Sequence, residues 1–270
     1  STFLMAKRFF TADFHFGMKL LLDEKIMKDA VRPFKTIDKM NSSFIRNCNE
    51  RAKVYTKEIP VLDKNGNQKV AYECKLDNFG NFIVDPDTMK PIIEKRLLFR
   101  KEITGKDLII HVGDLACFKS DREFSGLDVN PQEFIQKINA TFINIKGNHD
   151  LNNKVKSACT CMQTSLGKRF PNVTIGHYPS YDIRAKDMFR EGWIHICGHV
   201  HGAWKHCVDV TNNVLNVNVG VDAWNYSIIS EDELVPEEMK TNYLAELSYI
   251  SAYTEFNDFN KMDENFQKIL

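Results

Sequence analysis

Long hydrophobic runs are missing from this 270-residue sequence, and so is any net charge. No stretch approaches the ~18 consecutive apolar residues of a transmembrane helix, so no membrane association is expected. The 36 basic and 36 acidic residues cancel, which is far from the basic signature of a nucleic-acid-binding protein. Hydrophobic residues make up 43% and charged residues 27%, a globular composition that excludes a disordered or collagen-like chain.

Disulfide patterns, zinc-ribbon spacing and internal repeats are missing as well. The seven cysteines are an odd number, and Cys159 and Cys161 alone are too few for a tetrahedral metal site. We therefore expect reduced thiols and a cytoplasmic protein. Without repeats or low-complexity segments, the length favours one large domain or two small ones of ~150 residues each.

The charges that are present are unevenly distributed. Residues 231–270 contain ten acidic and three basic residues, a net charge of −7, so residues 1–230 carry +7. Ser230 and Glu233 have the spacing of a capping box, which predicts an acidic helical segment at about 231–270. We interpret this segment as solvated, and the mildly basic remainder as suited to an anionic substrate.

The hydrophobic pattern predicts an α/β fold. Five short apolar runs predict buried strands, at residues 8–11, 108–112, 141–145, 173–176 and 193–197. Apolar residues at three- and four-residue spacing predict a helix over 36–53, and Pro131 suits the start of a second helix ending near Ile138. Residues 214–221 alternate Val or Leu with Asn, which predicts a half-buried strand.

Residues 53–104 interrupt this rhythm. Asn65-Gly66 is a strong hairpin turn between two extended runs, and Gly80 marks a second turn. We predict a small β meander inserted between α/β elements. Its basic exit, residues 90–106, leaves two interpretations open: a lid that helps to select an anionic substrate, or a structural extension at the edge.

Each of the five predicted strands is followed by side chains that can bind a metal ion. In chain order these are Asp13 and His15, Asp114, Asn148 and His149, His177, and His199 and His201. Ligands bind beyond the carboxyl ends of strands in open α/β sheets, so these side chains are expected to converge. Residues two apart in an extended segment face the same way. Asp13 and His15 could therefore face one cavity together, and so could His199 and His201. The adjacent Gly113, Gly147 and Gly198 would permit tight turns there.

In this order the blocks read Asp-x-His, Gly-Asp, Gly-Asn-His-Asp, a lone His and Gly-His-x-His. They resemble the calcineurin-like metallophosphoesterase family over about residues 8–230. The chain is further similar to small bacterial and phage phosphoesterases, through His15-Phe16-Gly17, Arg32-Pro33-Phe34 and residues 218–222. The resemblance implies one domain over residues 1–270, built as a four-layer α/β/β/α sandwich that carries the meander as an insertion.

The resemblance also implies two divalent metal ions. One would be bound by Asp13, His15, Asp114 and His201, and the other by Asp114, Asn148, His177 and His199. Mixed nitrogen and oxygen ligands suit Mn²⁺, the expected metal, with Fe²⁺, Zn²⁺ and Ni²⁺ as alternatives. His149 is no ligand in this pattern: it would stabilise or protonate the leaving oxygen, with Asp150 orienting its ring. His111, Asn218 and Asp222 are expected to be structural.

The implied function is that of a dinuclear metal phosphoesterase in which a metal-bound hydroxide attacks phosphorus. The substrate would be a small anionic phosphomonoester or phosphodiester, with nucleotides among the candidates. A nuclease is the alternative enzyme, which the zero net charge disfavours. An inactive protein-binding scaffold is disfavoured because the ligand set is complete. A protein phosphatase is disfavoured because Leu115-Ala116-Cys117-Phe118 follows Asp114, so the phosphate-binding arginine of that subgroup is missing.

Overall fold

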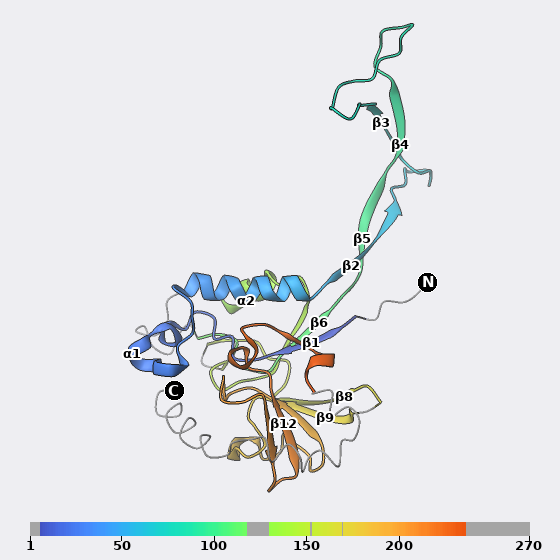
Figure 1. Cartoon of the computed structure of the whole chain (residues 1–270). Coiled ribbons are helices and arrows are strands. Elements are labelled where there is room, and N and C mark those ends of the chain that lie inside the picture. The colour runs from blue at the N-terminus through green and yellow to red at the C-terminus, as the bar shows by residue number, and fades with distance from the viewer. Residues whose placement is uncertain (1–5, 118–129, 152, 169, 236–270) are drawn as a thin grey trace. The chain divides into compact units, whose positions relative to one another are not determined.

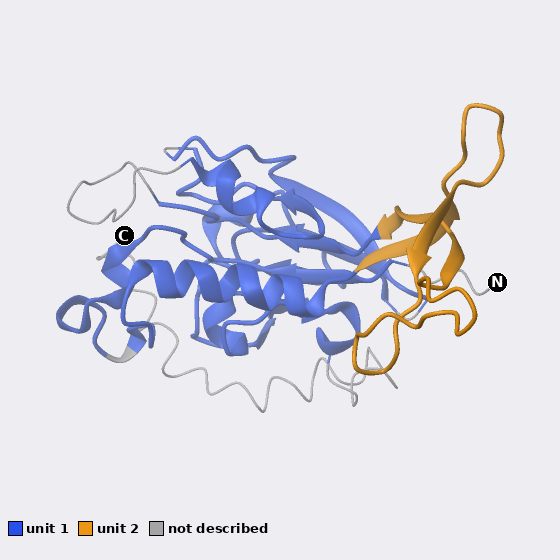
Figure 2. Cartoon of the chain, turned by 90° about the horizontal axis from the view of Figure 1, so that it is seen from above, with its two compact units in different colours: residues 1–53, 106–270 blue, residues 54–105 orange. Residues whose placement is uncertain are grey.

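The computed structural model describes residues 6–117, 130–151, 153–168 and 170–235. The chain divides into two compact units: a core unit (residues 1–53 and 106–270) and a ribbon unit (residues 54–105; Figure 2). The predicted insertion at 53–104 coincides with the ribbon unit to within one residue. No helix among the described residues is long and apolar enough to cross a membrane.

Two sheets form the core unit. The first has the order β13-β1-β6-β7, with β13 (Ile229–Ser230), β1 (Arg8–Thr11), β6 (Leu108–His111) and β7 (Thr141–Asn144). The second has the order β11-β12-β10-β9-β8, with β11 (His206–Asp209), β12 (Val214–Asn218), β10 (Ile194–Cys197), β9 (Phe170–Gly176) and β8 (Cys161–Leu166). The inner pairings are parallel, and β13, β11 and β8 are antiparallel edge strands. All five predicted strands are present, and four of them are largely buried, whereas β7 is only partly buried.

Strands β1 and β6 of the first sheet are buried on both faces, which explains their unbroken apolar runs. Phe9 pairs with Ile109 and Phe10 with Ile110, and successive residues point to opposite faces. Phe10 and Ile110 join a core cluster with residues of the second sheet, whereas Phe9 and Ile109 pack in a cluster with helical residues such as Phe44. Figure 1 shows α2 on one side of β1 and β6, and β9 and β12 on the other.

The helices begin at capping side chains. In α2 (Ile37–Arg51), Thr36 accepts a hydrogen bond from the Lys39 backbone N–H at 3.2 Å, and Met40, Phe44 and Cys48 form its buried face. In α3 (Pro131–Gln136), Asn130 accepts from the Gln132 N–H at 3.0 Å. These confirm the two predicted helices. The remaining helical pieces are α1 (Glu24–Met27) and the 3₁₀ turns Lys19–Leu22, Lys28–Ala30, Ile183–Ala185, Val221–Trp224 and Glu231–Glu233.

The fourth, helical layer of the expected sandwich is not confirmed by the described residues. Among the described residues no α-helix follows β9; instead an irregular segment with the 3₁₀ turn Ile183–Ala185 lies there. Phe189 of this segment packs its ring 6.4 Å from that of the buried His195 in β10. The described chain therefore forms three layers, α2 and α3, the first sheet and the second sheet, and the predicted fourth helical layer is not seen.

Strand β12 is buried on both sides, so the prediction of a half-buried strand is wrong. Its asparagines are interior groups with hydrogen-bond partners. The Asn216 side chain accepts from the Ser180 N–H at 2.8 Å, and the Asn218 side chain donates to the carbonyls of His201 and Trp204 at 2.7 and 2.6 Å. Alternating Asn in this strand reflects loops that need anchoring and not exposure to water.

The ribbon unit consists of nested antiparallel pairs. Strand β2 (Val54–Pro60) pairs with β5 (Phe99–Lys106), and β3 (Val70–Cys74) pairs with β4 (Ile93–Leu97). The consecutive strands β3 and β4 pair as in a meander, but β2 pairs with β5 and not with β3, so the predicted meander is not confirmed. None of residues 54–105 is buried, in keeping with a two-stranded ribbon that has no core of its own.

The ribbon also contains a repeat that the sequence analysis missed. Leu62-Asp63 and Leu76-Asp77 each begin a Leu-Asp-x-x-Gly-Asn segment, fourteen residues apart. In both, the Asp carboxylate accepts two backbone N–H bonds at 2.8 and 2.9 Å, from the residues two and four positions later. The two segments are the same Asp-capped turn used twice.

Asp107 fastens the chain where it enters and leaves the ribbon. Its carboxylate accepts from the backbone N–H groups of Lys7 and Lys53, both at 2.8 Å. Its own N–H donates to the Lys53 carbonyl at 2.9 Å, and its carbonyl accepts from the Thr141 N–H at 2.9 Å. The two ends of the insertion are therefore held directly side by side.

The C-terminal prediction is only partly covered by the described residues. The capping box of Ser230 and Glu233 is present, with the Ser230 N–H donating to the Glu233 carboxylate at 2.7 Å. It begins the 3₁₀ turn Glu231–Glu233 and not an α-helix within the described chain. Residues 236–270, the rest of the predicted acidic helical segment, lie outside the described residues.

Candidate metal centre

The predicted ligands come together where the loops after β1, β6, β7, β9 and β10 meet. The ligand atoms of Asp13, His15 and His201 lie within 4.8 Å of one another, and so do those of Asp114, His177 and His199. Asp114 lies between the two groups: its Oδ2 is 3.1 Å from His177 Nε2 and 3.8 Å from His15 Nε2. Asn148 Oδ1 is 3.0 Å from the same His177 nitrogen. The six other predicted ligands thus gather around the buried carboxylate of Asp114.

The backbone at these ligands is left-handed, not extended. The φ angles of Asp13, His15 and Asp114 are 58°, 47° and 59°, and those of His199 and His201 are 71° and 49°. The side chains of each pair do converge, but the extended geometry expected for them is wrong. Such a backbone is uncommon for residues with side chains and is typical of functional sites.

Two glycines are needed because the loops approach one another closely. A Cβ atom on Gly147 would overlap the carboxylate and backbone N of Asp114. A Cβ on Gly198 would lie 2.5 Å from the Cβ of Ala12 and 2.8 Å from Asp13 Oδ2. The glycines expected for tight turns therefore also make room for the two aspartates.

Hydrogen bonds at one ring nitrogen decide which nitrogen of each histidine can bind a metal. His177 donates from Nδ1 to the Val112 carbonyl at 2.8 Å, and His201 donates from Nδ1 to Asp222 Oδ2 at 2.8 Å. In both rings Nε2 is therefore the nitrogen that is left to bind a metal. His199 is different: its Nε2 faces Arg184 Nη2 at 2.9 Å, and its buried Nδ1 has no partner among the described residues.

Comparison with known proteins relates part of the chain to one family. The sequence model of the calcineurin-like phosphoesterase superfamily domain matches residues 93–225. Residues 93–225 thus match a calcineurin-like phosphoesterase domain. The matched range contains Asp114 and His201 and the ligands between them, but not Asp13 and His15. A solved structure of a protein of unknown function from Aquifex aeolicus is 18% identical, with a TM-score of 0.46, and covers 84% of this chain and 97% of its own. That likeness is too low to carry an argument. No curated protein matches.

Asp222 and Arg32 support the candidate metal centre, although Asp222 was expected to be only structural and Arg32 had no assigned role. The buried Arg32 guanidinium donates to both carboxylate oxygens of Asp222 at 2.8 Å. It also donates to the carbonyls of Asp13 and Phe14, at 2.5 and 2.8 Å. Burial opposes ionisation of Asp222, but Arg32 and His201 hold the pKa of this carboxyl well below its ordinary value. Asp222 therefore orients His201, in addition to the structural role expected of it.

Asp150 braces two ligand loops and does not contact the His149 ring in any hydrogen bond of the described structure. Its carboxylate accepts from the N–H groups of Leu115 and Gly147 at 2.8 Å and of Asp114 at 3.2 Å. This favours a loop-bracing role over the predicted orientation of His149. The His149 N–H donates to Asp114 Oδ1 at 2.9 Å, and its ring lies edge-on to that of His15, with centroids 5.2 Å apart.

Burial sets the protonation of the ligands. It lowers the pKa of His15 far below 6.5 and that of His199 to about 3, so both rings are neutral, the form that binds a metal. Burial raises the pKa of Asp13 to about 6. For His177 burial is outweighed by Asp114, whose carboxylate raises the pKa of the ring to about 9. A metal ion at His177 would therefore displace a proton.

The donor set fits divalent metal ions. Among the described residues both ring nitrogens of His15, His149 Nε2 and His199 Nδ1 are buried without a hydrogen-bond partner. Each such orphan costs about 1–3 kcal/mol, which a bound cation would offset at its ligands. Imidazoles mixed with carboxylates and an amide suit first-row transition metals better than Ca²⁺.

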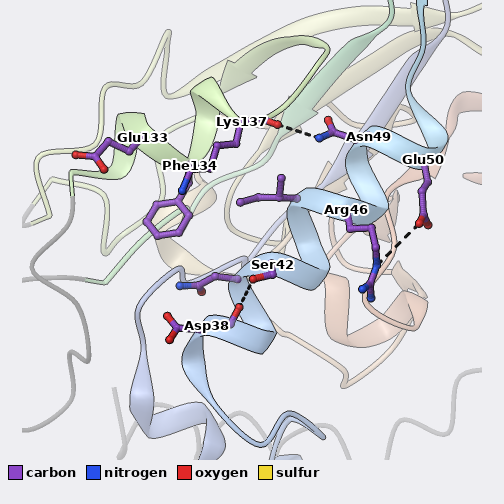
Figure 3. A pocket seen from close by; sticks show the side chains of 10 residues that line it. Asp38, Ser42, Arg46, Asn49, Glu50, Glu133, Phe134 and Lys137 are labelled. Carbon is purple, nitrogen blue, oxygen red and sulfur yellow. Dashed lines mark hydrogen bonds and ion pairs between the residues drawn. The ribbon is translucent and has the colours of Figure 1, made fainter.

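A separate cavity of about 670 Å³ lies between α2 and α3 (Figure 3). It is lined by polar side chains such as Ser42, Asn49 and Glu133, with the Asn49 side chain donating to the Lys137 carbonyl at 2.9 Å. None of the predicted metal ligands lines it, so this cavity is not part of the metal centre.

Proposed function

We propose that this chain is a dinuclear metal-dependent phosphoesterase that hydrolyses a small phosphomonoester or phosphodiester, with nucleotides among the candidate substrates. The observation that carries the proposal is the meeting of two ligand groups at the buried Asp114. A carboxylate in that position could act as a ligand to both cations. Mn²⁺ is the metal we propose, for the mixed nitrogen and oxygen donors.

Two divalent cations, when bound, would neutralise charge on the phosphate and provide the nucleophile at neutral pH. The protein residues then have distinct tasks. Asp13, His15 and His201 would hold one ion, Asn148, His177 and His199 the other, and Asp114 both. Arg32 and Asp222 fix the ring of His201, and Asp150 fixes the loop that carries Asn148 and His149.

We assign the proton transfer to His149. The leaving oxygen needs a proton as the ester bond breaks, and the chain offers a histidine whose backbone is tied to Asp114. Its buried Nε2 has no partner among the described residues, so it is available to a substrate oxygen. This role leaves the seven ligands intact, which makes the two kinds of residue separable by experiment.

The proposal is tested by hydrolysis assays on protein stripped with a chelator and reloaded with Mn²⁺. The panel contains an aryl phosphate, an aryl phosphodiester, cyclic and linear nucleotides, and DNA. We expect no turnover without metal and turnover of at least one small ester with it. The exposed Asp38→Asn is the matched control for Asp114→Asn and should behave like wild type.

Three results would contradict the proposal. Full activity in metal-free protein would remove the role of the ligands. Hydrolysis of DNA alone would favour the nuclease. Stoichiometric metal binding with no turnover of any ester would favour a binding scaffold.

A further inference from the structure

Arg184 places a cation at the edge of the metal centre. It lies in the 3₁₀ turn Ile183–Ala185, and its Nη2 is 2.9 Å from Nε2 of His199. Asp182 holds the guanidinium through two bonds, from Nε at 2.8 Å and from Nη2 at 2.5 Å. The Tyr178 ring lies beneath it, 4.2 Å from its central carbon. The side chain is still 40% exposed, so a molecule from solvent can reach it.

The contact between Arg184 and His199 is compatible with only one tautomer of the histidine. A guanidinium can only donate, so His199 Nε2 must accept and the single ring proton must be on Nδ1. Nδ1 is also the buried nitrogen without a partner among the described residues, the one positioned to bind a metal. A metal ion there needs the lone pair of Nδ1, which moves the ring proton to Nε2. Two donors would then face each other at 2.9 Å, so metal binding and this hydrogen bond exclude one another.

A bound metal ion would therefore end the hydrogen bond from Arg184 to His199, while the contacts with Asp182 and the Tyr178 ring could still hold the guanidinium. The N–H that faces His199 could then donate to an anion held at the metal centre. The planar guanidinium matches the oxygens of a phosphate group. We propose that Arg184 is a substrate-binding residue: it is bonded to His199 in the metal-free protein and binds a phosphate oxygen once the metal is present. This inference rests on the proposed function for the identity of its ligand.

The test uses the full chain and inorganic phosphate as the probe. Mn²⁺ affinity is measured by competition with a chelator, and phosphate affinity of the Mn²⁺-loaded protein by calorimetry. Arg184→Gln is compared with Arg184→Lys, and with Arg190→Gln as an exposed control from the same segment. We expect Arg184→Gln to bind phosphate roughly 10–100-fold more weakly, the range for a hydrogen bond to a charged group. Arg184→Lys, which keeps the charge but not the fork, should fall between it and wild type.

The metal measurement separates substrate binding from a structural role. Removing Arg184 removes both a nearby positive charge and the bond that holds the proton on Nδ1, so Mn²⁺ should bind as tightly as in wild type or more tightly. A residue that only braced His199 would give the opposite result, weaker metal with unchanged phosphate binding, and that outcome would overturn the proposal. Phosphate binding that is equally strong without Mn²⁺ would also overturn it.

The two proposals fail in different ways. If the loaded protein hydrolyses no ester but binds phosphate in a manner that depends on Arg184, the proposed catalytic function is wrong and this assignment holds. If esters are hydrolysed and both Arg184 variants bind phosphate like wild type, the catalytic function holds and the role of Arg184 is wrong.

Discussion

Replacing Asp222 with alanine should damage stability and metal binding together. The Asp222 carboxylate is the shared acceptor of the Arg32 fork and of the His201 ring, with all three bonds at 2.8 Å. The Arg32 side chain is fully buried, and that of Asp222 is only 12% exposed. Alanine would leave a buried guanidinium without its counter-ion and a ligand ring without its orienting acceptor.

The size of both effects follows from this burial. Breaking a buried ion pair by removing one partner costs about 3–5 kcal/mol. Domains are commonly stable by only ~5–15 kcal/mol, so the variant should lose a large share of its free energy of unfolding. Loss of a partner that orients a metal-binding histidine should lower Mn²⁺ affinity by about 10–100-fold. Glu50→Ala, which breaks an exposed 3.9 Å pair with Arg46, is the matched control and should cost under ~1 kcal/mol.

The assay is urea unfolding in excess chelator, so that bound metal does not add to stability, followed by metal competition titration. If Asp222→Ala does not fold, Asp222→Asn keeps the shape and one acceptor, and the metal titration is made on it. The reasoning would be refuted if Asp222→Ala unfolded within 1 kcal/mol of the Glu50→Ala control. Wild-type Mn²⁺ affinity in both Asp222 variants would refute the role assigned at His201.

Four further outcomes are expected. Asp114→Asn should lose metal and rate together, measured by metal analysis and turnover, because both ligand groups adjoin this carboxylate. His149→Ala should keep both metals and lose about 10²–10⁴-fold in rate, most for poor leaving groups; loss of metal would make it a ligand instead. Burial lowers the pKa of His195 to about 4, so between pH ~6.5 and 4 only the unfolded chain binds this proton. As the pH is lowered through this range, the free energy of unfolding should decrease by about 3 kcal/mol in all. His195→Gln should lack this dependence in unfolding curves measured at each pH. Replacing residues 54–105 by a short Gly/Ser turn should change the unfolding free energy by under ~1 kcal/mol, since none of them is buried, and a larger loss would contradict this.

The strands and the ligand positions could be predicted because local sequence carries them. Parallel strands buried on both faces are continuous apolar runs, and 8–11 or 108–112 can be recognised as such without any partner. Polar residues directly after such runs have no other place than the end of the strand. The meeting of Asp13, Asp114 and His201 follows from that placement, although the left-handed backbone that produces it does not.

Features that depend on pairing across the chain could not be predicted. Arg32 and Asp222 are 190 residues apart, and the sequence around either residue does not indicate that the other is its partner. In the ribbon the turns at Gly66 and Gly80 were recognised, but a turn fixes only its flanking residues, and β2 pairs with β5 across the whole unit. The outer helical layer was expected only from the family resemblance. The segment that packs on β10 through Phe189 has no hydrophobic periodicity from which it could have been predicted.

The hydrogen bonds of Asp107 should make the core unit insensitive to mutations in the ribbon unit. Because Lys53 and Asp107 are bonded to each other, the chain can leave and return without altering the spacing of the strands beside them. Substitutions, length changes and even exchange of the ribbon for an unrelated segment would be tolerated at low cost to the metal centre. The vulnerability is concentrated at one carboxylate that touches neither metal nor substrate: it ties the residue before β1, the end of α2 and the start of β6, and its loss would loosen all three at once.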